Sequence, residues 1–116
     1  MADAVFFEPR RTPVFVTSGG SNKKLANHTN KRVAYRFVFA NGSCFYAKPE
    51  QMCGFIPEWG KIDVTLYRKP GKANNETMTI QFAAAPDATD PSASFSTGTP
   101  QGEYAGETQV KLIGTE

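Results

Sequence analysis

The sequence contains a single histidine and two cysteines, the residue types from which a nucleophilic or metal site would have to be built. His28 lies between Asn27 and Thr29, the composition of an exposed turn, where a solvated imidazole is expected in place of a general base. A cysteine nucleophile would need Cys44 or Cys53 beside that histidine with a third, orienting group, and no such signature is present. One histidine and two irregularly spaced cysteines also make a poor zinc site. We therefore expect no catalytic residue, no metal and no cofactor.

Two further clusters have the residue types of functional motifs. Asp87 and Asp90 could be paired carboxylates, but they stand in Pro-Asp and Asp-Pro sequences, which turns explain. Gly19-Gly20 stands before Lys23-Lys24, yet the spacing of a phosphate-binding loop is absent and no helix is predicted to follow. We expect turns at both places.

The composition bounds the class of protein. A chain of 116 residues is long enough for one domain, residues 1–116, and its 40% hydrophobic and 21% charged residues are typical of a globular protein. A net charge of +2, with no run of more than two basic residues, indicates no nucleic-acid partner. Nine Phe and four Tyr favour strands over helices.

The beginning of the sequence indicates the expected subcellular localisation. The first eight residues have no basic region and no long apolar core, so no secretory signal is expected. No apolar run approaches the ~18 residues that a transmembrane segment needs. We expect a cytoplasmic protein with reduced thiols, while the spacing of Cys44 and Cys53 leaves a bridge between them open.

A hairpin is predicted at the centre of the chain. Two apolar, β-rich segments, residues 31–39 and 44–47, flank Asn41-Gly42, and an Asn-Gly pair is the strongest short-range hairpin signal. Alternate residues of the first segment share one apolar face, and Val38 makes the opposite face partly apolar. Such a strand belongs in the middle of a sheet. The residues of the apolar face are Val33, Tyr35, Phe37 and Phe39.

Shorter strands complete the predicted fold. The first two are separated by prolines and are interpreted as one broken edge strand. Residues 48–60 are expected to form a loop and a turn. Residues 83–98 are expected to form a long polar loop with at most one helical turn near Pro91. About seven short strands with regular turn signals predict an all-β protein, an immunoglobulin-like seven-stranded antiparallel β-sandwich. The remaining strands are expected at residues 5–7, 14–16, 23–27, 61–68, 78–83 and 110–113.

Two sets of exposed residues could bind a partner. Several basic residues could share the outer face of one sheet and take an acidic peptide, or simply supply solubilising charge. Trp59 with Phe55 could anchor a partner or plug the end of the sandwich. The basic residues are Arg32, Arg36, Lys48, Lys61 and Arg68.

Several segments of the sequence form one recognisable set of motifs. They are residues 31–36 after Asn27, residues 46–49 followed by Gly54-Phe55-Ile56, residues 80–83, the loop Asp87-Ala88-Thr89-Asp90-Pro91, and residues 106–112. Together these segments resemble the nematode major sperm protein domain. The residues that match the family's structural motifs are Asn27, Pro49, Gly54, Pro57, Asp87, Asp90 and Pro91. The resemblance implies a seven-stranded immunoglobulin-like sandwich and a cytosolic non-enzyme of nematode sperm, in a family whose major member dimerises and forms the filaments of amoeboid crawling.

The sequence departs from the family where relatives bind acidic peptides with two phenylalanines. The family's Lys-Thr-Thr run is replaced by Val38-Phe39-Ala40, and the lysine of the penultimate strand by Thr77. The acidic-peptide groove is therefore dismantled, and an exposed Val38 or Phe39 would be an apolar patch for a protein partner. The predicted protein-contact face is Arg36, Val38, Phe39, Lys48, Thr77 and Thr79.

The resemblance implies a function through protein–protein association in the sperm motility cytoskeleton, as a filament subunit or an accessory protein. Expected partners are proteins, including a second copy in a homodimer or filament. The alternative is a monomeric adaptor or signalling module that binds a peptide or receptor through one sheet face. The two differ in self-association, since a filament subunit uses repeated contacts between copies.

Overall fold

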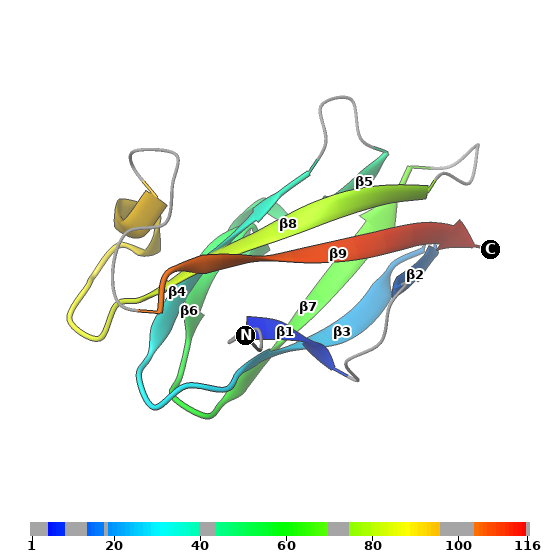
Figure 1. The fold of residues 1–116 in the computed structure, drawn as a ribbon. Helices are drawn as coiled ribbons and strands as arrows, with labels where there is room; N and C mark the ends of the chain where they lie inside the picture. Colours follow the sequence, from blue (N-terminus) through cyan, green and yellow to red (C-terminus); the bar gives the residue numbers. More distant parts are fainter. Residues whose placement is uncertain are drawn as a thin grey trace.

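Two β-sheets packed face to face make up this chain in a computed structural model, which describes residues 5–8, 14–17, 19–39, 44–69, 75–95 and 104–115 (Figure 1). The strands are β1 (Val5–Glu8), β2 (Val14–Thr17), β3 (Ser21–Asn27), β4 (Val33–Val38), β5 (Phe45–Ala47), β6 (Cys53–Ile56), β7 (Lys61–Arg68), β8 (Asn75–Ala84) and β9 (Gly106–Thr115). Two short 3-10 helices are η1 (Pro49–Gln51) and η2 (Pro91–Phe95).

The strand order confirms the predicted all-β, immunoglobulin-like sandwich. One sheet has four strands in the order β1-β3-β7-β5, and the other has five in the order β2-β9-β8-β4-β6. All described pairs are antiparallel except β2 with β9. The prediction of one broken edge strand is confirmed only in part, because β1 and β2 are both edge strands but belong to different sheets. The described strands exceed the predicted seven because β1 and β2 are separate strands and because β6 was predicted as a loop.

The core follows the alternation of the sequence. In β7, Val64 and Leu66 are buried while Lys61 and Asp63 are exposed, which confirms the predicted strand with one wet face. In β4, the predicted apolar face is buried in the main core, and the strand lies between β8 and β6 as a central strand should. The buried residues of that face are Val33, Tyr35 and Phe37.

The predicted hairpin is wrong. β4 and β5 lie in different sheets, since β4 pairs with β6 and β8 and β5 pairs with β7. Both hydrogen-bonding edges of β4 are therefore occupied by distant segments, while Phe45 and Ala47 are buried from the opposite sheet. Long-range burial outweighs the local turn signal; Asn41-Gly42 itself lies outside the described residues.

The loop predicted over residues 48–60 is partly wrong, because it contains β6. Gly54 lies opposite Tyr35, and a Cβ at Gly54 would stand 3.0 Å from the Tyr35 ring. The glycine is therefore needed for close contact inside a strand pair, a role that a local reading mistakes for a turn. The predicted turn is confirmed further on, where the Gly60 N–H donates to the Pro57 carbonyl at 3.0 Å.

Candidate functional site

The outer face of the five-stranded sheet collects most of the predicted contact residues. Residues 33, 35 and 37 of β4 and 78, 80 and 82 of β8 are buried in the core, so the residues between them point away from it. The register places Arg36 opposite Gln81 and Val38 opposite Thr79. We define the outer face as Arg36, Val38, Thr77, Thr79, Gln81, Glu107, Gln109 and Lys111.

Hydrogen bonds link side chains across the outer face. The Arg36 guanidinium donates to the Gln81 side-chain carbonyl through both Nε, at 2.9 Å, and Nη2. Gln81 in turn donates to Glu107 at 2.8 Å, and Thr79 donates to Gln109 at 3.1 Å. The arginine is thus bound to its own sheet, whereas Val38 is an apolar side chain with 40% of its surface exposed.

Two of the six predicted contact residues lie elsewhere. Phe39 packs against the main core, with its ring centroid 6.4 Å from that of Phe37. Lys48 is exposed but lies between β5 and η1. The structure therefore brings together Arg36, Val38, Thr77 and Thr79 and separates Phe39 and Lys48 from them.

The prediction that several of the five basic residues share one outer face is wrong. Arg68 is fully buried at the end of β7, and Lys61 belongs to the four-stranded sheet. Arg32 binds the backbone instead, donating to the Ala85 carbonyl at 2.9 Å and to the Ala88 carbonyl at 2.6 Å. It holds the chain between β8 and η2 against the sheet.

The Asn27 side chain links several backbone segments at one end of the sandwich. Its fully buried side chain donates through Nδ2 to the carbonyls of Lys31, Ile56 and Pro57 at 2.9, 3.2 and 3.0 Å. Its Oδ1 accepts from the Thr29 N–H at 3.0 Å and the Thr29 hydroxyl at 2.8 Å. One amide thus fixes two loops, residues 28–32 and 57–60, relative to each other.

The aspartates of the family motif lie in turns, as predicted. Asp87 is exposed in a turn, and Asp90 precedes Pro91, the first residue of η2. The Asp90 carboxylate accepts from the Ser92 hydroxyl at 2.8 Å and the Ser92 N–H at 3.0 Å, and these bonds lower the pKa of Asp90. Pro49, likewise, is the first residue of η1.

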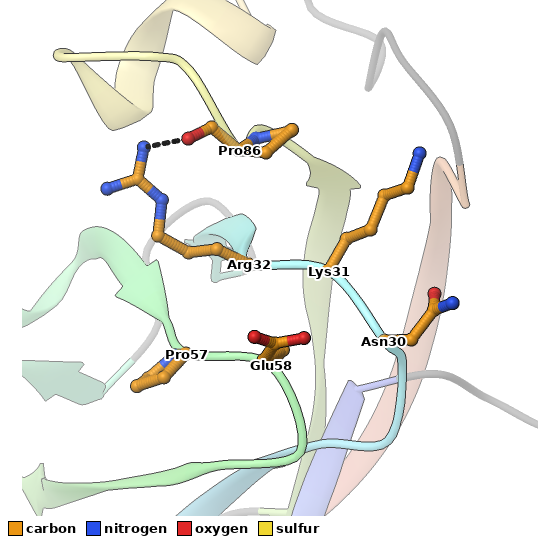
Figure 2. A pocket seen from close by; sticks show the side chains of 6 residues that line it. All are labelled: Asn30, Lys31, Arg32, Pro57, Glu58 and Pro86. Carbon is orange, nitrogen blue, oxygen red and sulfur yellow. Dashed lines mark hydrogen bonds between the residues drawn. The ribbon is translucent and has the colours of Figure 1, made fainter.

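A pocket opens at the end of the sandwich that Asn27 holds together. It has a volume of about 440 Å³, and we call it the loop-end pocket. Figure 2 shows its walls coming from three segments far apart in the sequence. It is lined by Asn30, Lys31, Arg32, Pro57, Glu58 and Pro86.

Two exposed aromatic residues are neighbours of residues that line the loop-end pocket, one in the sequence and one through a hydrogen bond. Trp59 follows the lining residue Glu58 and is 66% exposed, so it does not plug the sandwich. Tyr104 is 43% exposed, and its hydroxyl donates to the side-chain oxygen of Asn30 at 2.9 Å. Phe55, predicted as Trp59's companion, instead lies under the Arg32 guanidinium, 3.9 Å from the ring centroid.

The backbone of Trp59 is strained, which allows a stability test. Its φ of 52° is a left-handed conformation that is unfavourable for a bulky side chain. We expect Trp59→Gly to raise the free energy of unfolding by about 0.5–1 kcal/mol, because glycine adopts this conformation without a Cβ clash. Trp59→Ala is the matched control, since it removes the indole but keeps the Cβ. In urea unfolding, equal stabilisation by both variants would show that the backbone strain is not the cause.

Of the residues considered for catalysis, Cys53 lies opposite Arg36 in the pairing of β4 with β6, beside the outer face. The His28 ring packs on Phe6 with centroids 4.6 Å apart. Cys44 and Cys53 are free thiols, and burial, together with the nearby Asp90, raises the pKa of the Cys53 thiol. In the described ranges, no group of three His, Cys, Asp or Glu side chains could hold a metal ion. No helix in those ranges is long and apolar enough to cross a membrane.

Fold and surface together define an immunoglobulin-like β-sandwich whose five-stranded sheet carries Val38 exposed among polar side chains on its outer face. The sequence matches the model of the MSP (Major sperm protein) domain over residues 4–104, and the chain belongs to this family. It is 32% identical over 98 residues to the sperm-specific class P protein 34 of Caenorhabditis elegans, with 84% of this chain and 86% of that protein covered.

Two solved structures show the same architecture. WR4, an MSP family member of C. elegans, has a TM-score of 0.79 and 26% identity, covering 98% of this chain and 100% of that one. SSP-19, an MSP-domain protein-like family member of C. elegans, has a TM-score of 0.70 and 26% identity over 90% of this chain and 94% of that one. These likenesses confirm both the resemblance found in the sequence and the fold class.

Proposed function

We propose that this chain is a non-enzymatic protein of the sperm cytosol that acts by protein–protein association in the motility cytoskeleton of nematode sperm, as a filament subunit or an accessory protein. Membership of the MSP family and the likeness to sperm-specific class P proteins support the setting. The outer face supports the mode of action. It spans three neighbouring strands, β4, β8 and β9, and an exposed apolar side chain on such a surface suits contact with another protein.

Val38 is the observation on which this proposal depends. It is 40% exposed on a central strand, beside Thr79, in the position where acidic-peptide-binding relatives are expected to carry a lysine. Arg36, the nearest cation on the same strand, is already bound to Gln81. An apolar residue with hydrogen-bonding neighbours favours a neutral protein surface over an acidic peptide.

Val38→Glu is expected to weaken self-association by at least ~10-fold, equivalent to about 1.4 kcal/mol, because association would bury a carboxylate. The measurement is sedimentation velocity over a wide concentration range under reducing conditions. Tyr46→Glu is the matched control, since Tyr46 is 41% exposed but lies in the four-stranded sheet.

A monomer at all concentrations would refute the filament-subunit role. The wild-type chain and Val38→Glu would then be compared as baits in sperm cytosol, where an accessory protein should lose its partner on substitution of Val38 and keep it on substitution of Tyr46. If Val38→Glu and Tyr46→Glu captured the partner protein equally well, the outer face would not be the site of association.

A further inference from the structure

The outer face has an internal symmetry that follows from the register of its strands. Val38 lies opposite Thr79, and Thr79 lies opposite Gln109, so these three side chains form one row across β4, β8 and β9. We call it the central row, and all its side chains are uncharged. Glu107 and Lys111, both exposed, lie two positions to either side of Gln109 along β9. An acid and a base therefore stand equally far from the central row, on opposite sides.

Glu107 and Lys111 cannot form an ion pair with each other inside one chain. Four residues of an extended strand span about 13 Å, which is far beyond the distance of an ion pair. Glu107 accepts a hydrogen bond from Gln81 at 2.8 Å, and a carboxylate has room for several more donors. Among the residues that the structure describes, Lys111 belongs to no ion pair. Both charges can therefore pair with a second molecule.

The third charged residue of the outer face, Arg36, is bound to its own sheet. It shares a row with Gln81 and Glu107 and donates to the Gln81 side chain through Nε at 2.9 Å. Its guanidinium also lies 5.2 Å from the centroid of the Phe95 ring. With two cations and one carboxylate, the face as a whole selects neither a basic nor an acidic partner. What it presents is the opposite placement of Glu107 and Lys111 along β9.

A two-fold axis along the central row makes this face complementary to a second copy of itself. Such an axis lies in the plane of contact, across the strands, and sets β9 of one copy antiparallel over β9 of the other. Glu107 of each copy then faces Lys111 of the other, and Val38 faces Val38. Since a residue on a two-fold axis meets its own copy, a charge there would repel itself, and the central row has none. A two-fold axis along β8 would instead set Val38 against Gln109, an apolar side chain against an amide.

The 3-10 helix η2 limits the contact at one end of the sheet (Figure 1). Phe95 of η2 packs with Ala34 and Ala85 in a small second core, so η2 covers the outer face beyond the row of Arg36. Under the two-fold axis, this end of one copy lies over the opposite end of the other copy, past Val38, where β4 ends. The helix η2 of one copy therefore does not meet β4 of the other.

We propose that the outer face binds a second copy of this chain in a two-fold dimer, with the central row on the axis and Glu107 of each copy paired with Lys111 of the other. This inference rests on the proposed function, because it names the partner and the arrangement of the association assigned there to the outer face. Two exposed ion pairs flank one apolar contact, so the dimer dissociates on dilution and is weakened by salt.

Charge reversal tests the pairing of the two copies. Glu107→Lys or Lys111→Glu alone turns both ion pairs into like-charge contacts, so each variant should dimerise at least ~10-fold more weakly than the wild type. An equimolar mixture of the two variants restores both pairs with opposite signs and should dimerise like the wild type. Sedimentation velocity under reducing conditions at about 20 mM salt, where screening is weak, measures all three samples. Recovery in the mixture would also show that both variants are folded.

The same charge changes elsewhere provide matched controls. Glu50→Lys on η1 and Lys61→Glu on the four-stranded sheet alter exposed residues away from the outer face, so each should dimerise like the wild type. If Val38→Glu separates the copies but the mixture of charge variants stays as weak as each variant alone, the outer face associates in another arrangement and this inference is wrong. If neither Val38→Glu nor the charge variants weaken the dimer, the outer face fails as well. A wild type that stays monomeric at all concentrations would overturn the dimer and leave only the accessory role.

Discussion

Asn27→Ala is expected to lower the free energy of unfolding by about 3–5 kcal/mol, the largest effect that we predict for this chain. The substitution removes the donor for three backbone carbonyls and the acceptor for the Thr29 N–H and hydroxyl. Asn27 is fully buried, so water cannot simply replace the amide. Urea unfolding followed by far-UV circular dichroism measures the loss.

Two comparisons make the Asn27 prediction specific. Asn22→Ala removes the same side chain at an exposed position of β3 and should change stability by less than about 0.5 kcal/mol. Asn27→Asp keeps the shape and the acceptor but turns a carboxylate oxygen toward three carbonyl groups, so at pH 7 it should be no more stable than Asn27→Ala. A loss of less than about 1 kcal/mol in Asn27→Ala would mean that other contacts hold the two loops.

The hydrogen bonds of Asn27 also show how much of the loop-end pocket could be predicted from the sequence. Asn27 stands out in the sequence through its match to a family motif, but its partners Ile56 and Pro57 are 29 and 30 positions away. The left-handed conformation of Trp59 depends on these contacts and on the carbonyl of Thr29. No local pattern around Trp59 indicates it, so the sequence left open whether this residue plugs the sandwich or binds a partner.

The outer face was more accessible to prediction, because strands have a period of two. Alternation along β4 and β8 separates Arg36, Val38, Thr77 and Thr79 from the core residues between them. The bonds from Arg36 to Gln81 and from Gln81 to Glu107 depend on the register of three strands, which alternation does not fix. The face was therefore predictable, and the pairing of its charges was not.

The same limit accounts for the errors in the fold. The Asn-Gly signal describes a turn and says nothing of competing partners, and β6 and β8 occupy both edges of β4. Gly54 looks like part of a turn until Tyr35 is placed across from it. Strand pairing between distant segments decides both cases, and it depends on packing that one sequence does not display.

Alkaline pH should destabilise the fold through Tyr35, the second large effect. The Tyr35 side chain is 2% exposed, and its hydroxyl donates to the Gln51 carbonyl at 3.0 Å. Burial, with a smaller contribution from the charge of the Cys53 thiolate, raises the pKa of Tyr35 to about 12 from 10.0. The folded state thus keeps a proton that the unfolded state loses, so the stabilisation is complete below pH ~10 and is lost as the pH rises through 12. At about 1.36 kcal/mol for each pKa unit, the full loss is roughly 2.7 kcal/mol.

Comparison with Tyr35→Phe isolates this contribution, because all other titrating groups are shared by the two proteins. At pH 7 the variant should be less stable by about 1 kcal/mol, since the Gln51 carbonyl loses its donor. Between pH 10 and 12 only the wild type loses the Tyr35 contribution, so the two stability curves should cross near pH ~11. Urea unfolding at a series of pH values measures both curves. Curves that stay parallel through pH 12 would show that the phenol ionises equally well in the folded and unfolded chains, and that β6 does not seal Tyr35 from water.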